Sequence, residues 1–183
     1  MGAGILPVSL YKGHVMFLFG KERATGLWSD FGGSTERGET EIQTAVREGS
    51  EELNGFYGSG EDLFDKINYS LLNKLYYDSY STYIFRVDYD KSVPKYFNNN
   101  NKFAEYYLPN IVSGRKNSLF EKSEIRWFTM EEMRDQKRMF RPFYRSIINI
   151  LVHDYITLRS NAKNVNVYPD KAYSENVSVV RVS

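Results

Sequence analysis

The segment 33–52 most constrains how this chain can fold, because a glycine-containing loop leads there into a short amphipathic helix. Thr40 is suited to cap the first turn, and Gln43 three residues later completes the pattern of a capping box. Asn54-Gly55 is typical of a helix stop. The sequence therefore predicts a helix over residues 41–53 that packs one face against a core.

Two faces of this predicted helix differ in chemistry. At about 100° per residue, one apolar stripe collects Ile42, Ala45, Val46, Gly49 and Leu53. A second face carries Glu48, Glu51 and Glu52, whose like charges repel by a few tenths of a kcal/mol per solvated pair. A hard divalent cation would remove that repulsion, and carboxylate oxygens suit Mg²⁺ or Mn²⁺. Taken alone, three such glutamates are more typical of a solvated acidic face.

The complete spacing of the segment resembles the signature of the Nudix hydrolases. That signature is Gly, five residues, Glu, seven residues, Arg-Glu, two residues, Glu-Glu. The matching positions here are Gly33, Glu39, Arg47, Glu48, Glu51 and Glu52. The hairpin and Gly-Gly approach before the segment and the Glu-Ile-Arg-Trp run at 124–127 are also similar to the family. The resemblance covers roughly residues 2–150.

Three positions depart from the family pattern without removing a metal ligand. Gly49 stands where the family has an aliphatic residue, which reduces helix propensity by about 1 kcal/mol. Asn54 stands where the family has its closing Gly, and Asn tolerates the left-handed cap. Phe31-Gly32-Gly33 follows Asp30 where many members have Pro-Gly-Gly.

The resemblance implies an α/β (α+β) fold, the Nudix-type α/β/α sandwich with a mixed central sheet and the signature loop and helix. We expect a Nudix domain over residues 1–160, with an insertion around 88–118, and a tail or added strand over 161–183. Local patterns predict strands at 5–10, 15–19 and 125–128, strand-like sequence at 76–87 and a helix that begins at Thr129. The secondary structure of residues 63–75 is ambiguous, and residues 88–118 are predicted to be irregular. Residues 141–158 are predicted to form one helix, and residues 177–182 have a β-prone sequence.

The implied activity is Mg²⁺-dependent hydrolysis of a pyrophosphate bond in a nucleoside diphosphate linked to another group. By this resemblance Glu48, Glu51, Glu52 and the Gly32 carbonyl would hold Mg²⁺, with Mn²⁺ as a substitute. Arg47 would orient a carboxylate, and Gly33 and Glu39 would shape the loop that precedes the helix. The general base is predicted as Glu121, and the alternatives are Glu124 and Glu105.

Substrate-binding residues follow less directly from the sequence. Lys21 and Arg23 follow the second predicted strand, where phosphate contacts are expected, although solvated loop cations fit the same pattern. Trp28, Phe31 and Tyr83 fit either a base pocket or the core. Lysines and aromatic residues within 88–118 would suit single-stranded RNA, which keeps mRNA decapping open.

Composition narrows the class of protein. The 183 residues suffice for one domain with a core, and the net charge of +1 indicates no strong attraction to a nucleic-acid backbone or membrane. Without cysteine there is no disulfide, thiolate-bound zinc or cysteine nucleophile. No apolar run reaches the roughly 20 residues of a membrane span. We expect a soluble, cytoplasmic protein that binds a nucleotide-type small molecule, with a homodimer left open.

Three functions remain in competition. The first is an enzyme for small nucleotide derivatives, which the complete signature favours. The second is mRNA decapping, which the aromatic and basic insertion favours. The third is a non-catalytic nucleotide-binding regulatory module, suggested by Gly49 and the unusual residues before the loop.

Overall fold

A mixed sheet lies at the centre of the computed structural model, which describes residues 1–113 and 119–169. Its strands in the described residues are β1 (Gly2–Tyr11), β2 (His14–Glu22), β3 (Trp28–Ser29), β4 (Phe31–Ser34), β5 (Leu71–Tyr77), β6 (Tyr80–Arg86) and β7 (Lys122–Phe128). The order is β3-β2-β1-β6-β5, while β4 pairs with β1 and β7 pairs with β2. The β1–β6 pair is parallel and the other pairs are antiparallel.

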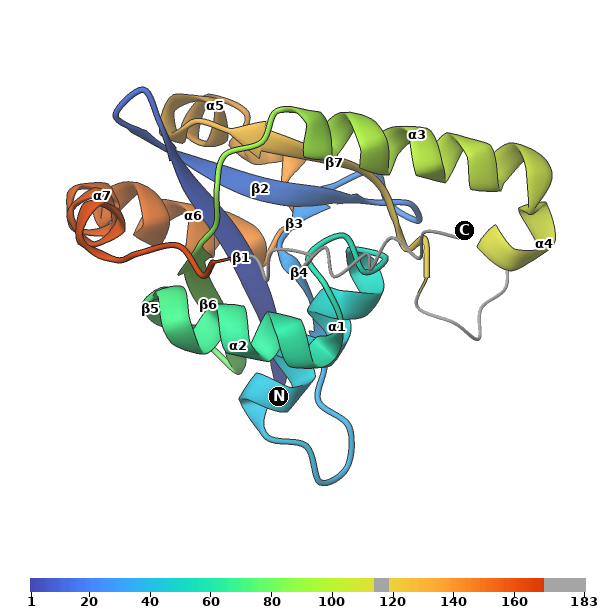
Figure 1. Cartoon of the computed structure of the whole chain (residues 1–183), viewed down its shortest axis with the longest axis horizontal. Coiled ribbons are helices and arrows are strands. Elements are labelled where there is room, and N and C mark those ends of the chain that lie inside the picture. Colours follow the sequence, from blue (N-terminus) through green and yellow to red (C-terminus); the bar gives the residue numbers. More distant parts are fainter. Residues whose placement is uncertain (114–118, 170–183) are drawn as a thin grey trace, which may run out of the picture.

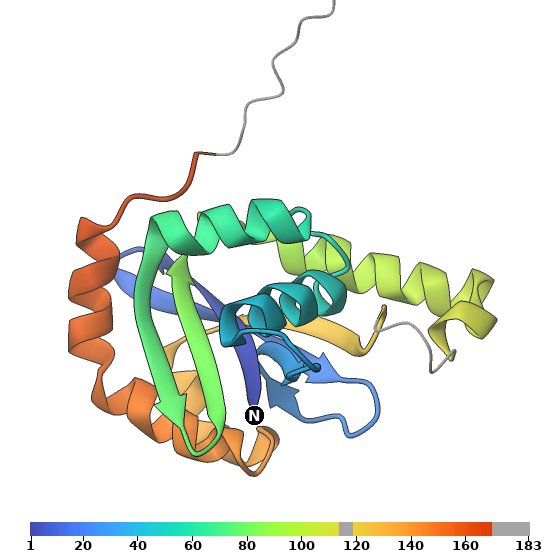
Figure 2. The same cartoon turned by 90° about the horizontal axis from the view of Figure 1, so that it is seen from below.

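Helices cover both faces of this sheet (Figures 1 and 2). They are α1 (Glu41–Glu52), α2 (Gly60–Ser70), α3 (Ser92–Tyr107), α4 (Pro109–Val112), α5 (Met130–Asp135), the 3-10 turn η1 (Lys137–Met139), α6 (Tyr144–His153) and α7 (Tyr155–Asn164). Side chains of β2 alternate between the two cores: Phe17 packs with α6 and α7, whereas Leu18 packs with α1 and α2. This layering confirms the predicted α/β/α sandwich.

The predicted signature helix is present as α1, and its ends follow the local sequence. Thr40 and Gln43 form the reciprocal bonds of a capping box. Asn54 and Gly55 have φ values of 50° and 73°, the left-handed conformation that ends a helix. Both predicted boundary signals are confirmed.

Gly49 has a packing reason that its helix propensity does not reveal. A Cβ at Gly49 would lie 2.5 Å from Cδ1 of Ile5, a side chain of β1 that is completely buried. The glycine therefore allows α1 to approach β1 closely. Its residue type is explained by this packing, and the suggestion that Gly49 marks lost turnover has no structural support.

The prediction of irregular structure over 88–118 is wrong for its described part, which forms α3 and α4. Phe97 and Ala104 pack inward, and the Asn101 side chain donates to the Phe97 carbonyl. The Asn98 amide exchanges bonds with the backbone of Ile125 in β7. The asparagine run has poor helix propensity, and these tertiary contacts override it. Residues 114–118 lie outside the described residues.

Other boundaries also differ from the predictions. The single helix predicted over 141–158 is two helices, α6 and α7, which meet at Asp154. The strand-like stretch 76–87 contains the turn Asp78-Ser79 between β5 and β6, and the ambiguous 63–75 spans α2 and β5. Since α7 runs to Asn164, the expected boundary at residue 160 falls inside a helix. The β-prone 177–182 lies outside the described residues.

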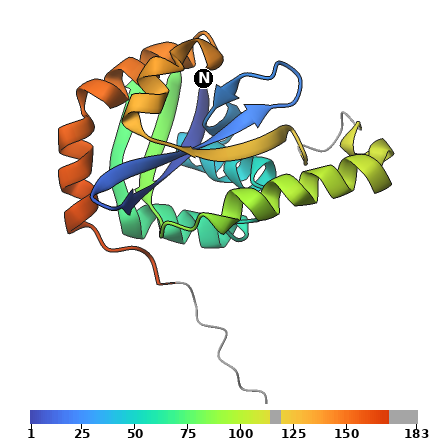
Figure 3. The ribbon, with the colours of Figure 1, turned by 90° about the horizontal axis from the view of Figure 1, so that it is seen from above.

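Helix α3 lies next to strand β7, and α4 follows it beyond the end of that strand (Figures 1 and 3). Among the described residues, no helix combines the length and apolarity that crossing a bilayer demands.

Candidate active site

The backbone of β4 lies directly against two carboxylates of α1. A Cβ at Gly33 would meet Oε1 of Glu48 at 2.4 Å, so the glycine leaves room for that carboxylate in its observed position. The Gly32 N–H donates to Oε2 of Glu52 at 2.8 Å. The predicted cluster is therefore held on the signature loop by close backbone approach.

Arg47 ties the loop to the helix. Its guanidinium donates to both carboxylate oxygens of Glu39, at 2.7 and 3.0 Å, and to Oε1 of Glu48 at 2.9 Å. It also donates to the Ser34 carbonyl at 3.1 Å. The Arg47 hydrogen bonds, with the Glu36 backbone N–H, lower the pKa of Glu39 to about 2. Because Arg47 spans loop and helix, it can hold Glu48 in place.

Glu51 completes the acidic face of α1. Its Oε2 atom is buried and has no hydrogen-bond partner among the described residues, and Arg47 lies 3.6 Å from it. Burial raises the pKa of Glu48, against the opposing effect of Arg47. A buried carboxylate oxygen without a hydrogen bond is costly, so this face suits an additional positive ligand.

A buried lysine, Lys122 of β7, lies at the other side of this cluster. Its ammonium group forms ion pairs with Glu22 and, at 3.3 Å, with Oε1 of Glu52. It also donates to Oγ of Ser29 at 2.9 Å. No local pattern marks Lys122 as buried, because it stands among the polar residues Glu121, Ser123 and Glu124.

The charge of this lysine acts on two fully buried carboxyl groups, Glu52 and Asp30. Burial raises the pKa of Glu52 to about 8, although Lys122 opposes the shift. Burial likewise raises the pKa of Asp30 to about 7, and the hydroxyls of Tyr80 and Thr82 donate to it at 3.0 and 3.2 Å. One lysine therefore faces more carboxyl groups than it can neutralise, which favours a protonated carboxyl in the absence of another cation.

The comparison with family models decides the assignment: the model of the NUDIX domain matches residues 2–149. The chain belongs to the Nudix family. No curated protein matches the chain by sequence. Family membership confirms the prediction of a Nudix pyrophosphohydrolase, a class that generally needs a divalent metal.

Several solved structures are similar to this chain. The Nudix chain is similar to a bifunctional NMN adenylyltransferase/ADP ribose pyrophosphatase from Francisella tularensis, complexed with AMP and manganese. That match has 16% identity and a TM-score of 0.51, and it covers 83% of this chain and 41% of the other. An Ap4A hydrolase of C. elegans matches with 16% identity and a TM-score of 0.45, covering 81% and 91%. A Nudix hydrolase from M. smegmatis matches with 14% identity and a TM-score of 0.48, covering 85% and 86%.

The residues predicted to contact substrate are mostly engaged elsewhere in this Nudix domain. Trp28 and Phe31 are core side chains with exposures of 2% and 0%, which does not fit direct contact with a substrate. Arg23 donates to the Phe120 carbonyl and to Asn101 and forms an ion pair with Glu105, so it anchors α3. Lys21 lies 3.6 Å from Glu124 and keeps partial exposure.

Of the three glutamates considered as general base, Glu121 lies close enough to the signature carboxylates for the charges of Glu48 and Glu51 to act on it. Burial raises its pKa, and the charges of Glu48 and Glu22 add to the shift. Glu105 and Glu124 are each paired with a cation, Arg23 and Lys21. Glu121 is thus the member of the set whose environment favours proton uptake.

The acidic cluster offers the right atoms for a divalent cation, but its members are held apart. In residues 1–113 and 119–169, no three acidic, histidine or cysteine side chains are gathered closely enough to hold a metal. Arg47 holds Glu48, and Lys122 holds Glu52. The Glu51 oxygen, which accepts no hydrogen bond from the described residues, and the all-oxygen donor set fit Mg²⁺ or Mn²⁺.

Proposed function

We propose that this Nudix domain hydrolyses a pyrophosphate bond in a small nucleotide derivative, with Mg²⁺ as the preferred ion and Mn²⁺ as a substitute. The observation that carries the proposal is the buried carboxylate oxygen of Glu51 beside Glu48, which accepts no hydrogen bond from the described residues and has only an ion pair with Arg47 at 3.6 Å. Glu48, Glu51, Glu52 and the Gly32 carbonyl would hold the cation. When bound, the ion would neutralise pyrophosphate oxygens and favour an ionised water.

The chain's own residues divide the remaining work. Glu121 would accept the proton of the attacking water on its carboxylate as the new P–O bond forms and the bridging P–O bond breaks. A carboxylate whose pKa is raised towards neutrality is the better general base. Arg47 would keep Glu48 directed at the loop through its bonds to Glu39 and Ser34.

A second candidate substrate is the 5′ cap of an mRNA. Helix α3 exposes four aromatic side chains, Tyr96, Phe103, Tyr106 and Tyr107. Exposed lysines at 95 and 102 accompany them, while the Glu105 charge is paired with Arg23. Aromatic rings and unpaired cations on one helix suit stacked bases and phosphates.

The test is a screen of nucleotide pyrophosphates with Mg²⁺ and with Mn²⁺, in which mass spectrometry identifies the products. Dinucleotides, nucleotide sugars, nucleoside triphosphates and capped RNA form the panel, and a chelated reaction is the control. We expect phosphate-ended products from a small nucleotide derivative only with metal. The absence of metal-dependent products across the panel would refute the proposal. If the chain binds capped RNA no more tightly than it binds the free cap dinucleotide, that result would count against decapping.

A further inference from the structure

A cavity of about 330 Å³ opens beside the signature loop, and we name it the hairpin pocket. It is lined by Met1, Gly2, Gly32, Gly33, Ser34, Tyr77, Asp78, Ser79, Tyr80, Arg141 and Phe143. Its volume lies within the roughly 300–1,000 Å³ of small-molecule sites. Gly32 lines the pocket and also donates its N–H to Glu52, so the pocket adjoins the acidic cluster of α1.

One wall of the hairpin pocket is aromatic and rigid. The guanidinium of Arg141 lies over the Phe143 ring, 5.0 Å from its centroid. Tyr80 packs edge-on against Phe143 at 5.5 Å, and its hydroxyl is held by Asp30. A flat ring with fixed neighbours is a surface on which a planar base can stack.

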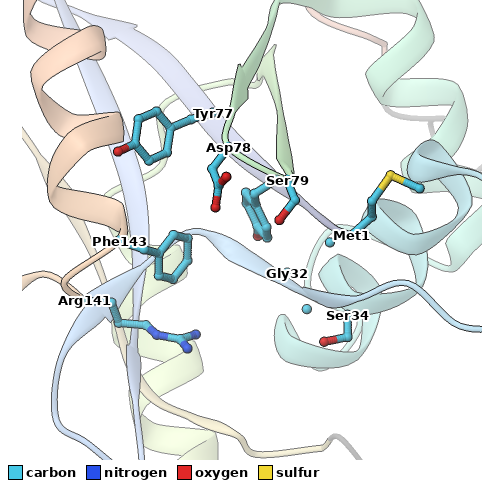
Figure 4. A pocket seen from close by; sticks show the side chains of 11 residues that line it. Met1, Gly32, Ser34, Tyr77, Asp78, Ser79, Arg141 and Phe143 are labelled. Atoms are coloured by element: carbon cyan, nitrogen blue, oxygen red, sulfur yellow. The ribbon is translucent and has the colours of Figure 1, made fainter.

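The facing wall is the turn between β5 and β6. Asp78 is exposed there with a φ of 56°, and no ion pair of its carboxylate is found within the described ranges. Figure 4 shows the side chains of Asp78 and Ser79 directed into the same space as Phe143. The pocket therefore combines an aromatic wall with an unneutralised acceptor at its rim.

We propose that the hairpin pocket binds the base of a guanosine nucleotide, and this assignment rests on the proposed hydrolysis of a nucleotide derivative. Guanine presents two adjacent N–H donors on its Watson–Crick edge, which match the two oxygens of the Asp78 carboxylate. Adenine would place a ring-nitrogen acceptor against that carboxylate. With the base on Phe143, the phosphates extend along Gly33 and Ser34 towards α1.

The first experiment compares kcat/KM for diguanosine and diadenosine tetraphosphate with Mg²⁺. We expect the full chain to prefer the guanosine compound, and Asp78→Asn to reduce this preference about tenfold, the size of one lost bidentate base contact. Asn tolerates the left-handed turn, so the fold should persist. Asp65→Asn, an exposed aspartate on α2, is the matched control and should keep the preference. Equal kcat/KM values for the two bases, or an unchanged preference in Asp78→Asn, would overturn the assignment.

The second experiment separates the pocket from the catalytic proposal. Calorimetric titration of the metal-free chain with GMP and with AMP measures base recognition without turnover. GMP binding that weakens in both Asp78→Asn and Phe143→Ala supports the pocket, even if no pyrophosphate is hydrolysed. Hydrolysis that proceeds while GMP binds no better than AMP overturns the pocket and leaves the catalytic proposal standing.

Discussion

Lys122 Nζ lies 3.3 Å from Oε1 of Glu52, and both side chains are withdrawn from solvent. The lysine comes from β7 and the glutamate is the last residue of α1, so the pair connects the signature helix to strand β7, which pairs with β2. Since Glu22 shares the same ammonium group, one buried cation holds two carboxylates.

Replacing Lys122 with Met should destabilise the fold strongly. The change leaves the Glu22 carboxylate without its cation, and breaking a buried pair on one side costs about 3–5 kcal/mol. Urea unfolding at neutral pH measures the loss. Lys95→Met, at an exposed position of α3, is the control and should change stability by less than about 0.5 kcal/mol. Equal unfolding midpoints in the two variants would contradict the pairing.

Glu51→Gln and Glu52→Gln should each lower the rate of hydrolysis by about two orders of magnitude or more, because an anionic metal ligand is lost. Circular dichroism should report an unchanged fold in Glu51→Gln. Glu61→Gln, on the exposed first turn of α2, should retain full activity. Near-wild-type turnover in both ligand variants would refute the metal assignment.

Glu121→Gln should lower kcat by about 10²-fold or more with little change in KM, since a general base is removed. The base is active when deprotonated, so wild-type activity should fall as the pH drops through the pKa of Glu121. That pKa lies above the ordinary 4.5, because burial and Glu48 raise it. The variant should lose this acid limb of the pH–rate profile. If Glu121→Gln keeps the acid limb of its pH–rate profile unchanged, another group accepts the proton.

The Glu39–Arg47 pair should make stability depend on acid pH. The pKa of Glu39 is lowered to about 2, so the ionised form stabilises the fold above the ordinary value of 4.5. This contribution decreases as the pH falls from 4.5 towards 2. The difference in urea midpoint between wild type and Glu39→Gln should therefore shrink between pH 6 and pH 3. A constant difference would show that the Glu39 charge does not contribute.

Gly49→Ala should destabilise the chain although alanine favours helices. Helix propensity would gain about 1 kcal/mol, but the new Cβ lies 2.5 Å from Cδ1 of Ile5, and overpacking a core costs about 1–3 kcal/mol. The new Cβ would also lie 2.7 Å from Cγ1 of Ile5, and Ile5→Ala removes both of these atoms. Thermal unfolding should show Gly49→Ala as destabilising in the wild type and as neutral or stabilising in the Ile5→Ala background.

The sequence alone determined the features that depend on local spacing. The capping box of Thr40, the stop at Asn54-Gly55 and the acidic face of α1 involve residues within a few positions of one another, so their geometry follows from helix periodicity. The Nudix assignment has the same origin, since its motif is contiguous. These are the elements in which prediction and structure agree.

Only the tertiary structure decided which distant residues meet. Lys122 reaches Glu52 across 70 positions of sequence because β7 pairs with β2, and no local pattern distinguishes it from a surface lysine. Helix α3 forms through contacts to β7 that outweigh the poor propensity of its asparagines. Phe143 and Asp78 stand 65 positions apart in the sequence and line one pocket. Burial and long-range contacts are properties of the folded chain, and local sequence carries no direct measure of them.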